Sequence, residues 1–399
     1  MTQATATTPS AIMPTYFFQL PIAFEKGEGI WLYDAEGKKY LDGLCGISVT
    51  NLGHSHPVIT KAICDQAAKL IHTSNTFQIP AQQILAQKLV KLSGMEQVYF
   101  CNSGAEANEA AIKISRMFAR KKNISNPAIV VMENGFHGRT MGVVGACNKR
   151  TRGGFEPFLP DFVRVPYDDL EAIKSAAHQY ENIVAVMVEP IQGESGVHIP
   201  NENYLKGIRE ICDQHDWLMI LDEVQTGLGR TGKWFDCQHF NVLPDIMTLA
   251  KSLAGGLPIG ACLARGKASN MFQPGKHGTT FGGNPLVCTA GLAVLNTLEK
   301  DNLVKNAETM GNYVVKKLKE TLGKKSEIKD IRGRGLMIGI EFDRPCRDLM
   351  AIGLKHGMLF IISADKVIRL LPPLIITQAD ADEIVKRLNL VADEFLNVR

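Results

Sequence analysis

The sequence has none of the long apolar runs, paired-cysteine motifs or histidine motifs that identify several large protein classes. No run reaches the roughly 18 consecutive apolar residues that a membrane-spanning helix requires. The nine cysteines contain no C-x-x-C pair, and the ten histidines contain no H-E-x-x-H motif. We therefore predict neither a membrane protein nor a metal centre.

A strong charge of either sign is also missing. The 44 Lys and Arg residues nearly balance the 41 Asp and Glu residues, which leaves a formal charge of +3 on 399 residues. So small an excess predicts no nucleic-acid or membrane partner. The first 13 residues contain no basic residue and are unlike a secretory or transit signal. Cys101, Cys262 and Cys288 stand among apolar or small residues, as buried reduced thiols do, so we expect a cytoplasmic protein.

What the chain does contain is a long alternation of helix-like and strand-like segments. Its 399 residues exceed one ordinary core. Between residues 58 and 290 the alternation predicts a large domain with a mostly parallel sheet and helices on both faces. We expect residues 1–57 and 291–399 to form a smaller α+β domain together. Its expected elements are a hairpin at 29–41, a helical region at 290–319, a strand at 335–342 and a helix at 380–395.

Polar residues follow several apolar runs at the points where strands should end. Residues 218–221 lead into Asp222, and residues 246–250 lead into Lys251. Ligands of an open α/β sheet gather beyond the carboxyl ends of its strands, so this acid and this amine should meet at one site. A carboxylate beside a buried lysine suggests Schiff-base chemistry. Three more runs end similarly, at 98–101 before Asn102, 129–132 before Gly135 and 183–188 before Glu189.

Lys251 and Asp222 each have a commoner alternative role. Most lysines are solvated surface groups, but Lys251 stands between Ala250 and a segment of small residues that ends in Gly256. Partial burial there would lower its pKa toward the neutral, nucleophilic amine. Asp222 alone would more often be a helix cap or a loop acid, and its pairing with Lys251 makes it a candidate catalytic group.

Residues 102–108 lie between a predicted strand and an alanine-rich helix that we expect to end near Lys122. The free N–H groups at the start of this helix and the Ser103 hydroxyl would suit a phosphate. Ser103 could equally be a plain N-cap.

A glycine-rich loop at residues 227–233 matches both G-x-G-x-x-G and G-x-x-x-x-G-K. A P-loop needs Ser or Thr after the lysine, where this chain has Trp234, and a dinucleotide loop should leave its strand directly and open a helix. We expect both matches to be accidental, so a nucleotide-binding ATPase or dehydrogenase is the least favoured function.

Residues 136–140 combine the flat ring of Phe136, a glycine that permits close approach, and the guanidinium of Arg139. The planar fork of an arginine binds both oxygens of a substrate carboxylate. The alternative is that Phe136 belongs to the core and Arg139 to the surface.

With these residues assembled, the chain resembles the class III, pyridoxal phosphate dependent aminotransferases, and within them the acetylornithine aminotransferase group. The resemblance implies the type I pyridoxal phosphate dependent transferase fold, pyridoxal 5'-phosphate as cofactor, and a homodimer whose active sites are shared at the interface. The motifs that carry it cover nearly the whole chain, at residues 27–29, 53–57, 102–108, 136–140, 188–194, 221–232, 251, 277–285 and 368–372.

The resemblance also implies roles for the residues that match these motifs. Lys251 resembles the lysine that binds the cofactor covalently, and Asp222 resembles the acid that pairs with its pyridine nitrogen. Phe136 resembles the ring that stacks on the cofactor, and Gln225 the donor to its phenolic oxygen. The remaining predicted cofactor contacts are Ser103, Gly104 and Ala105 as the phosphate cradle, Thr280 reaching the phosphate from the partner subunit, and His137, Glu189 and Val224.

The implied reaction moves the terminal amine of a donor, N-acetylornithine, to 2-oxoglutarate, and gives a semialdehyde and glutamate in a ping-pong cycle. Arg139 resembles the residue that binds the substrate carboxylate. Glu194 and Arg369 resemble a pair that closes on itself or opens to free the arginine for the acceptor. Tyr16 or Phe17 resembles the aromatic that some relatives place against the donor.

Two departures from the acetylornithine group leave the donor open. Ser195-Gly196 stands where that group commonly has two glycines, and Leu370-Leu371 replaces a Phe-Ala pair. Ornithine, succinylornithine and 4-aminobutyrate therefore remain alternative donors. Decarboxylation or aminomutase chemistry on the same cofactor is a less favoured alternative.

Overall fold

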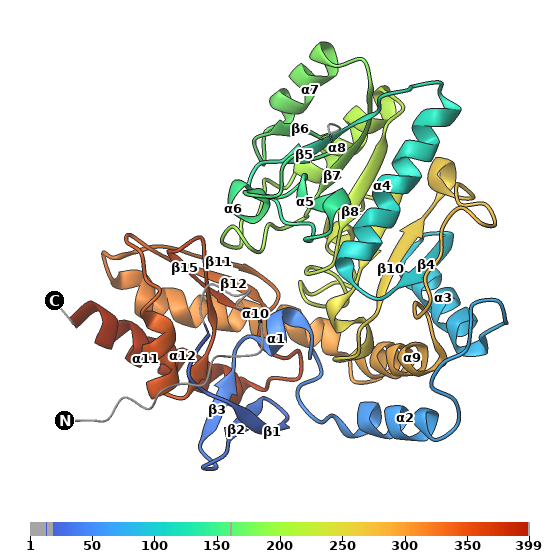
Figure 1. Ribbon diagram of the computed structural model, residues 1–399. Coiled ribbons are helices and arrows are strands. Elements are labelled where there is room, and N and C mark those ends of the chain that lie inside the picture. Colours follow the sequence, from blue (N-terminus) through green and yellow to red (C-terminus); the bar gives the residue numbers. More distant parts are fainter. Residues whose placement is uncertain (1–12, 14–18, 160–161, 398–399) are drawn as a thin grey trace.

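The computed structural model describes residues 13, 19–159 and 162–397. A seven-stranded sheet forms one part of the molecule, and two four-stranded sheets form the other. Figure 1 shows the large sheet with its helices in the upper part and the two smaller sheets at the lower left.

The large sheet is mostly parallel, as predicted. Every neighbouring pair of strands is parallel except the two pairs that involve β10, which runs against both of its neighbours. The strands are, in sheet order, β4 (Gln97–Cys101), β10 (Gly260–Ala264), β9 (Ile246–Leu249), β8 (Leu218–Asp222), β7 (Ile183–Val188), β5 (Ala128–Met132) and β6 (Phe162–Val165).

Helices cover both faces of this sheet, which explains why its strands are continuous apolar runs. The long helix α4 (Gly104–Lys121) crosses one face, and α7 (Leu170–Gln179) and α8 (Tyr204–Gln214) lie on the other (Figure 1). Successive side chains of a strand point to opposite faces. In β8, Leu218 and Ile220 therefore pack into the core on the α4 side, whereas Met219 and Leu221 pack into the other core.

The two ends of the chain meet in the smaller part, as predicted. The expected hairpin is present, and its second strand pairs in parallel with a strand from the C-terminal region. One small sheet has the order β1 (Phe24–Glu28), β2 (Trp31–Asp34), β3 (Lys39–Asp42) and β13 (Met358–Leu359). The other has the order β11 (Ile328–Arg334), β12 (Met337–Phe342), β15 (Val367–Leu370) and β14 (Ile361–Ser363).

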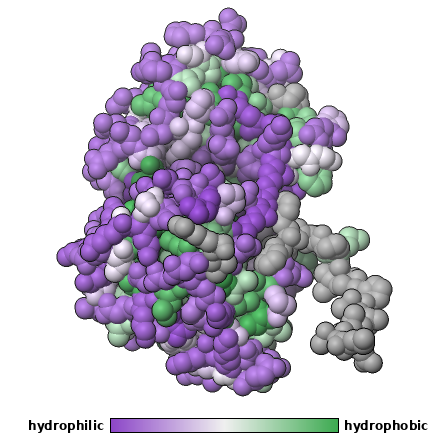
Figure 2. Space-filling view, turned by 90° about the vertical axis from the view of Figure 1, so that its left-hand side faces the viewer, coloured by the Kyte–Doolittle hydropathy of each residue, from purple (hydrophilic) through white to green (hydrophobic). Residues whose placement is uncertain are grey.

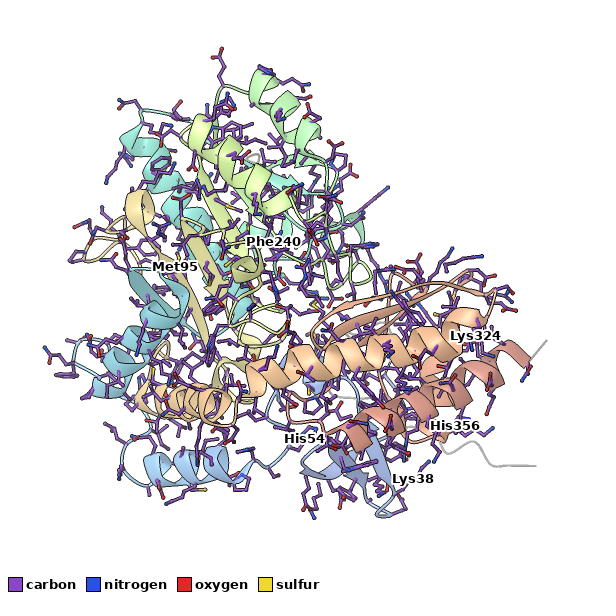
Figure 3. All side chains as sticks on the ribbon, turned by 180° about the vertical axis from the view of Figure 1, so that it is seen from behind. Lys38, His54, Met95, Phe240, Lys324 and His356 are labelled. Carbon is purple, nitrogen blue, oxygen red and sulfur yellow. The ribbon has the colours of Figure 1, made fainter. Side chains whose placement is uncertain are left out.

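The helical region expected at 290–319 is present and consists of two helices. α9 (Pro285–Lys300) starts at the Asn284 cap, and α10 (Leu303–Thr321) follows it. Asn302 between them has φ +52°, a left-handed conformation that ends a right-handed helix. α9 packs on α2 (Pro57–Ala67) and α3 (Pro80–Ser93), and α10 packs on α12 (Gln378–Asn397). Figure 3 shows α10 running across the back of the molecule toward Lys324.

The other expected elements of the C-terminal part are present with shifted bounds. β12 begins at Met337 instead of Gly335, α12 covers the predicted final helix, and strand β11 was not predicted. The division of the chain at residues 57 and 290 stays a prediction, and residue 290 lies inside α9. The remaining short elements are α1 (Cys45–Ser48), α5 (Met141–Val144), α6 (Lys149–Arg152), α11 (Leu349–Lys355) and the 3₁₀ turns η3 (Gly266–Ala268) and η4 (Leu322–Lys324).

The glycine-rich loop at 227–233 belongs to the larger part of the molecule and contacts the smaller part. No α-helix follows it directly, since the next element is the 3₁₀ turn η1 (Asp236–His239). Its Arg230 is fully buried and donates to the carbonyls of Leu336 and Pro372 and to the Ser48 hydroxyl. The hydrogen bonds of Arg230 thus join this loop to the turn between β11 and β12, to the segment after β15 and to α1.

Cys101, Cys262 and Cys288 are buried, as predicted. In the described part of the chain, no helix combines the length and the apolar character needed to cross a membrane. Figure 2 shows the side of the molecule that carries the small sheets, and its surface is mostly hydrophilic with small, separate hydrophobic patches.

Candidate active site

A cavity of ≈ 520 Å³ lies at the carboxyl ends of the central strands of the large sheet. It brings together residues from segments that are far apart in the sequence, and most of the predicted site residues line it. The lining residues are Val49, Asn102–Ala105, Asn108, Phe136–Arg139, Glu189, Asp222, Val224, Gln225, Ala250, Lys251 and Gly256–Ile259.

Lys251 follows β9 and begins the 3₁₀ turn η2 (Lys251–Ala254). Its φ of +45° is left-handed, an unfavourable conformation for a lysine that tends to occur at functional sites. Burial is the main cause that lowers its pKa, and the positive charge of Arg369 acts in the same direction. Among the described residues, no hydrogen-bond or ion-pair partner holds its amine. The geometry therefore presents a reactive amine to the cavity.

Asp222, the last residue of β8, is 4% exposed. Its Oδ2 accepts a hydrogen bond from the Asn108 amide at 2.8 Å and lies 2.8 Å from His137 Nδ1. Among the described residues, its Oδ1 accepts only the backbone N–H of Val224, at 3.1 Å. Burial alone would raise the pKa of Asp222, but these hydrogen bonds outweigh it and hold the pKa below its ordinary value.

Two further titratable groups, His137 and Glu189, line the cavity together with Asp222. Burial tends to lower the pKa of His137, but its contact with Asp222 raises it overall. The other ring nitrogen, Nε2, is buried without a hydrogen-bond partner among the described residues. Burial raises the pKa of Glu189 to about 7. One oxygen of Glu189 accepts the backbone N–H of Phe136 at 2.8 Å.

The position of Ser103 is consistent with both of its predicted roles, as a helix cap and as a phosphate contact. Its hydroxyl caps α4 by accepting the Glu106 N–H at 3.2 Å, and Ser103 also lines the cavity with Gly104 and Ala105. At Gly104 an added Cβ would lie 2.8 Å from a methyl group of Val224. Only glycine therefore lets the start of α4 approach Val224 this closely.

Phe136 and Arg139 lie at the cavity together. The Arg139 guanidinium carbon is 5.0 Å from the centroid of the Phe136 ring, within cation–π range. Arg139 is exposed and Phe136 is partly buried. The Arg139 guanidinium is thus accessible from the cavity.

Glu194 and Arg369 form an ion pair that does not itself line the cavity. The distance from Arg369 Nη2 to Glu194 Oε1 is 2.9 Å, and Arg369 Nη1 donates to Gln225 Oε1 at 3.2 Å. Arg369 is fully buried. Burial tends to raise the pKa of Glu194, but the arginine lowers it overall. Gln225 lines the cavity and so connects this pair to it.

Thr280, like Glu194 and Arg369, does not line this cavity. Thr280 lines a separate polar pocket with His72, Ser74, Asn75, Thr76, Gly278 and Thr279. Tyr16 and Phe17 lie outside the described residues, so the expectation for them stays a prediction.

The sequence-based prediction missed Asn108 and Thr248. The Thr248 hydroxyl donates to Asn108 Oδ1 at 2.8 Å, and Asn108 in turn donates to Asp222. The only signal for Thr248 was a hydroxyl within the apolar run 246–250, and the signal for Asn108 was its place one turn beyond Gly104. Both are small polar residues of a kind that occurs in many cores.

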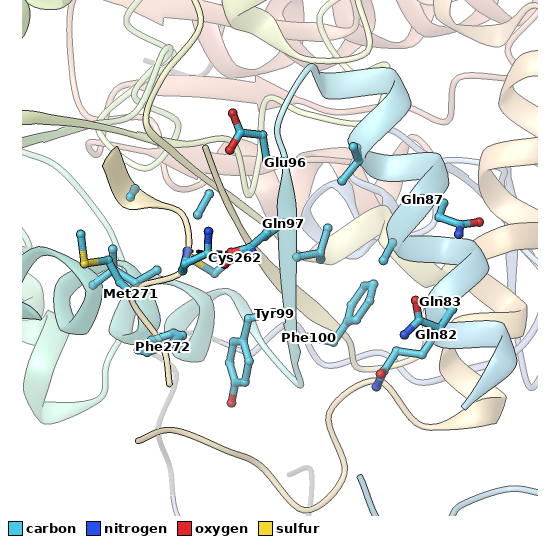
Figure 4. A pocket seen from close by; sticks show the side chains of 17 residues that line it. Gln82, Gln83, Gln87, Glu96, Gln97, Tyr99, Phe100, Cys262, Met271 and Phe272 are labelled. Atoms are coloured by element: carbon cyan, nitrogen blue, oxygen red, sulfur yellow. Dashed lines mark hydrogen bonds between the residues drawn. The ribbon is translucent and has the colours of Figure 1, made fainter. Parts of the chain in front are cut away.

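A larger cavity, of ≈ 580 Å³, lies between α3, β4 and the segment around Met271. Figure 4 shows the amides of Gln82, Gln83 and Gln87 along one side of it and Tyr99 and Phe272 on the other. Glu96 is the only charged residue that lines it, and no lysine does. The residues that line this cavity therefore include no lysine amine that could form a Schiff base as Lys251 could. Elsewhere, no cluster of three or more metal-binding side chains occurs among the residues with described positions.

Comparison with known proteins identifies relatives of this chain. The family model described as Aminotransferase class-III matches residues 13–391. The acetylornithine aminotransferase of Nitrosomonas europaea is 51% identical over 98% of this chain and 99% of its own length. The protein of the same name from Methanocaldococcus jannaschii is 44% identical over 94% of each chain.

Solved structures of related enzymes share the fold. The ornithine aminotransferase of Toxoplasma gondii has a TM-score of 0.92 and 35% identity, and the match covers 97% of this chain and 93% of that one. The acetylornithine aminotransferase of Elizabethkingia anophelis has a TM-score of 0.85 and 37% identity, with 95% and 96% covered. The chain therefore belongs to the class III aminotransferases, with the type I α/β fold and the pyridoxal phosphate dependent amino-group transfer of that family.

Proposed function

We propose that this aminotransferase transfers the terminal amino group of N-acetylornithine to 2-oxoglutarate and releases a semialdehyde and glutamate. The observation that carries this proposal is the Glu194–Arg369 pair connected to the cavity through Gln225. A ping-pong enzyme of this kind must accept two unlike substrates in one site, and a second carboxylate is present near the reacting carbon only in the acceptor. An arginine that is paired in one half-reaction and free in the other meets this demand.

The residues at the cavity fit pyridoxal phosphate. Lys251 supplies an amine without a partner in the described structure, and Asp222 supplies a buried, ionised acid. Gly104 leaves space at the start of α4, where free N–H groups favour a phosphate. We propose that Lys251 and Asp222 are the catalytic residues. We assign cofactor contacts to Ser103, Gly104, Ala105, Phe136, His137, Glu189, Val224 and Gln225.

When bound, the cofactor supplies an electron-withdrawing ring that makes the proton beside the donor's reacting amine labile. Asp222 would hold positive charge at the ring nitrogen, because the donors around the carboxylate favour its ionised form. Lys251 would hold the cofactor, and its amine, when free, would accept a proton from the substrate and return it. Burial favours the neutral form of this amine, so it can act as the base.

Arg139 is the proposed partner of the donor's α-carboxylate, because it is exposed at the cavity beside Phe136. Arg369 is the proposed partner of the acceptor's second carboxylate. At the two positions where the sequence differs from the acetylornithine aminotransferase group, the side chains contact other parts of the protein. Ser195 donates its hydroxyl to Gln192 at 3.1 Å, and Leu371 is fully buried. Neither residue lines the cavity. These contacts support a donor site like that of the acetylornithine relatives.

Steady-state rates with a panel of donors test the donor assignment. N-acetylornithine, ornithine, succinylornithine and 4-aminobutyrate are each supplied with 2-oxoglutarate, and glutamate, the semialdehyde and carbon dioxide are measured. We expect the highest kcat/KM with N-acetylornithine, glutamate equal to semialdehyde, and no carbon dioxide. A higher kcat/KM with another donor would refute the assignment, and release of carbon dioxide would favour the decarboxylase alternative.

Ornithine is the second candidate donor. The Toxoplasma gondii ornithine aminotransferase superposes with a TM-score of 0.92, above the 0.85 of the acetylornithine enzyme from Elizabethkingia anophelis. The sequence comparison favours acetylornithine, since the relative at 51% identity carries that name.

We also propose a homodimer in which Thr280 reaches the cofactor phosphate of the partner. The pocket that contains Thr280 is held by Asn75, whose amide donates to the carbonyls of Thr279 and Gly282. Phe281 beside it is 61% exposed and lies 5.3 Å from the His72 ring. Exposed apolar side chains next to polar groups are common where a second chain docks.

The reduced state of the nine cysteines supports a cytoplasmic location.

Mixing two inactive variants tests the shared site. Chains with Lys251→Ala and chains with Thr280→Glu are unfolded, mixed and refolded together. If Thr280 serves the partner's site, one site in each mixed dimer is intact, and about a quarter of the wild-type activity returns. No recovery, in a sample that light scattering shows to be dimeric, would contradict this arrangement.

A further inference from the structure

A buried chain of hydrogen bonds runs from β9 through α4 to Asp222. The Thr248 hydroxyl donates to Asn108 Oδ1 at 2.8 Å, and Asn108 Nδ2 donates to Asp222 Oδ2 at 2.8 Å. The same Nδ2 donates to the His137 carbonyl, also at 2.8 Å. Thr248 is fully buried and Asn108 is 1% exposed, so water does not compete with these bonds.

Strand register and the alternation of side chains in the sheet explain why these hydrogen-bonding residues lie together. Asp222 and Thr248 are paired in the parallel register of β8 and β9. Alternate residues share a face, so Asp222 lies on the same face as Leu218 and Ile220, and Thr248 on the same face as Ile246. That face is covered by α4, which carries Asn108. Three distant segments thus meet within hydrogen-bond distance.

The three contacts of Asn108 fix which way its amide points. Its oxygen faces the Thr248 hydroxyl, and its nitrogen faces two acceptors, the Asp222 carboxylate and the His137 carbonyl. Rotating the amide by half a turn would place its oxygen against both acceptors. Without the Thr248 donor, the preference for the observed orientation would be weaker.

The orientation of the Asn108 amide determines which lone pairs of the Asp222 carboxylate remain free. Oδ2 contacts two donors, Asn108 and His137, so both of its lone pairs are used. Within the described part of the chain, Oδ1 accepts only the Val224 N–H, which leaves one of its lone pairs free. The carboxylate is therefore held with one oxygen bound to the protein and the other oxygen able to accept one more donor.

We propose that Thr248 and Asn108 are positioning residues that hold the Asp222 carboxylate so that Oδ1 is the oxygen offered to the cofactor's ring nitrogen. This inference rests on the proposed role of Asp222. Thr248 does not reach the cavity, and it acts through Asn108.

Cofactor affinity of the apoprotein tests this inference without using activity. Thr248→Val keeps the shape of the side chain and removes the hydroxyl, whereas Thr248→Ser keeps the hydroxyl. We expect Thr248→Val to raise the Kd for pyridoxal phosphate about tenfold and Thr248→Ser to stay within about twofold. The control is Thr297→Val on α9, where a buried threonine hydroxyl donates to the Ala293 carbonyl away from the cavity. This control should leave the Kd unchanged.

A double-mutant cycle separates positioning from general destabilisation. In an Asp222→Ala background, Thr248→Val should have no further effect on Kd, because its target is gone. Asn108→Ala combined with Thr248→Val should be no weaker than Asn108→Ala alone. Additive effects, or equal Kd values for the Val and Ser variants, would overturn the inference. If Asn108→Ala does not fold, the Val–Ser comparison and the Asp222 cycle still decide it.

The role of Asp222 itself is checked in the same experiment. An unchanged Kd for Asp222→Ala would refute the proposed function of that residue. A weakened Asp222→Ala together with an unaffected Thr248→Val would refute the positioning role alone.

Discussion

Arg369 lies completely inside the protein, yet its guanidinium is paired with Glu194, a residue whose side chain is 35% exposed, across 2.9 Å. The buried cation is thus neutralised by an acid at the edge of the fold. An acid in such a position can move away when another carboxylate replaces it, whereas a fully buried acid could not.

Glu194→Ala should leave Arg369 unpaired in both half-reactions. The uncompensated cation would repel the cationic amine of the donor, so we expect the donor KM to rise about tenfold, equivalent to about 1.4 kcal/mol. The KM for 2-oxoglutarate should stay within about twofold. Single-turnover kinetics with each substrate measure this difference. Glu383→Ala, which breaks a comparable ion pair with Arg387 on α12, is the control. Equal changes for both substrates would argue against the switch.

Gly104→Ala should weaken cofactor binding because the new Cβ would lie 2.8 Å from Val224 Cγ1 and push the start of α4 away. We expect a Kd for pyridoxal phosphate at least about tenfold higher. The double variant Gly104→Ala, Val224→Ala removes the clashing methyl groups and should recover most of the affinity. If the second substitution recovers nothing, steric contact with Val224 is not the reason for the glycine.

Lys251→Ala should reduce multiple-turnover transamination by at least about 1,000-fold, because it removes both the covalent anchor and the base. Borohydride reduction of the wild-type protein with bound cofactor should label Lys251 and remove the visible absorbance. Lys206→Ala, on an exposed position of α8, should behave as wild type in both assays. Turnover at the wild-type rate in Lys251→Ala would refute the assignment.

Glu189 should make the apoprotein less stable as the pH rises. Its pKa is about 7 in the folded state against an ordinary value of 4.5, so between these values the folded chain holds a proton that the unfolded chain has lost. Ionisation of Glu189 in the folded protein therefore lowers the free energy of unfolding progressively from about pH 5 to pH 8. Glu189→Gln removes this cost, so its free energy of unfolding relative to wild type should rise by up to about 3 kcal/mol over that range.

Urea unfolding of the apoprotein at pH 5 and pH 8 measures this effect. The buried Glu223, whose pKa burial also raises to about 7, is present in both proteins and cancels in the difference. Glu210→Gln makes the same change of charge at an exposed position of α8 and should show no such dependence. A pH-independent difference between Glu189→Gln and wild type would contradict the raised pKa.

Several features could not have been read from the chain. Strand β11 was missed because it is an edge strand, with only Ile328 and Ile331 buried and polar residues around them. The break between α9 and α10 was missed because Asn302 is neither glycine nor proline, although its short polar side chain tolerates the left-handed conformation.

Local sequence by itself determined five of the seven strands of the large sheet and the placement of Asp222 and Lys251 after two of them, whereas β6 and β10 were not predicted. An apolar run buried on both faces has to stop where the sheet meets solvent, and the polar residue that follows is carried to that edge. Only the tertiary structure decided that Asn108 and Thr248 hold Asp222 and that Arg369 is buried against Glu194. These contacts depend on strand register, on the face that α4 covers and on the approach of β15 to the segment after β7, and no spacing along the chain encodes them.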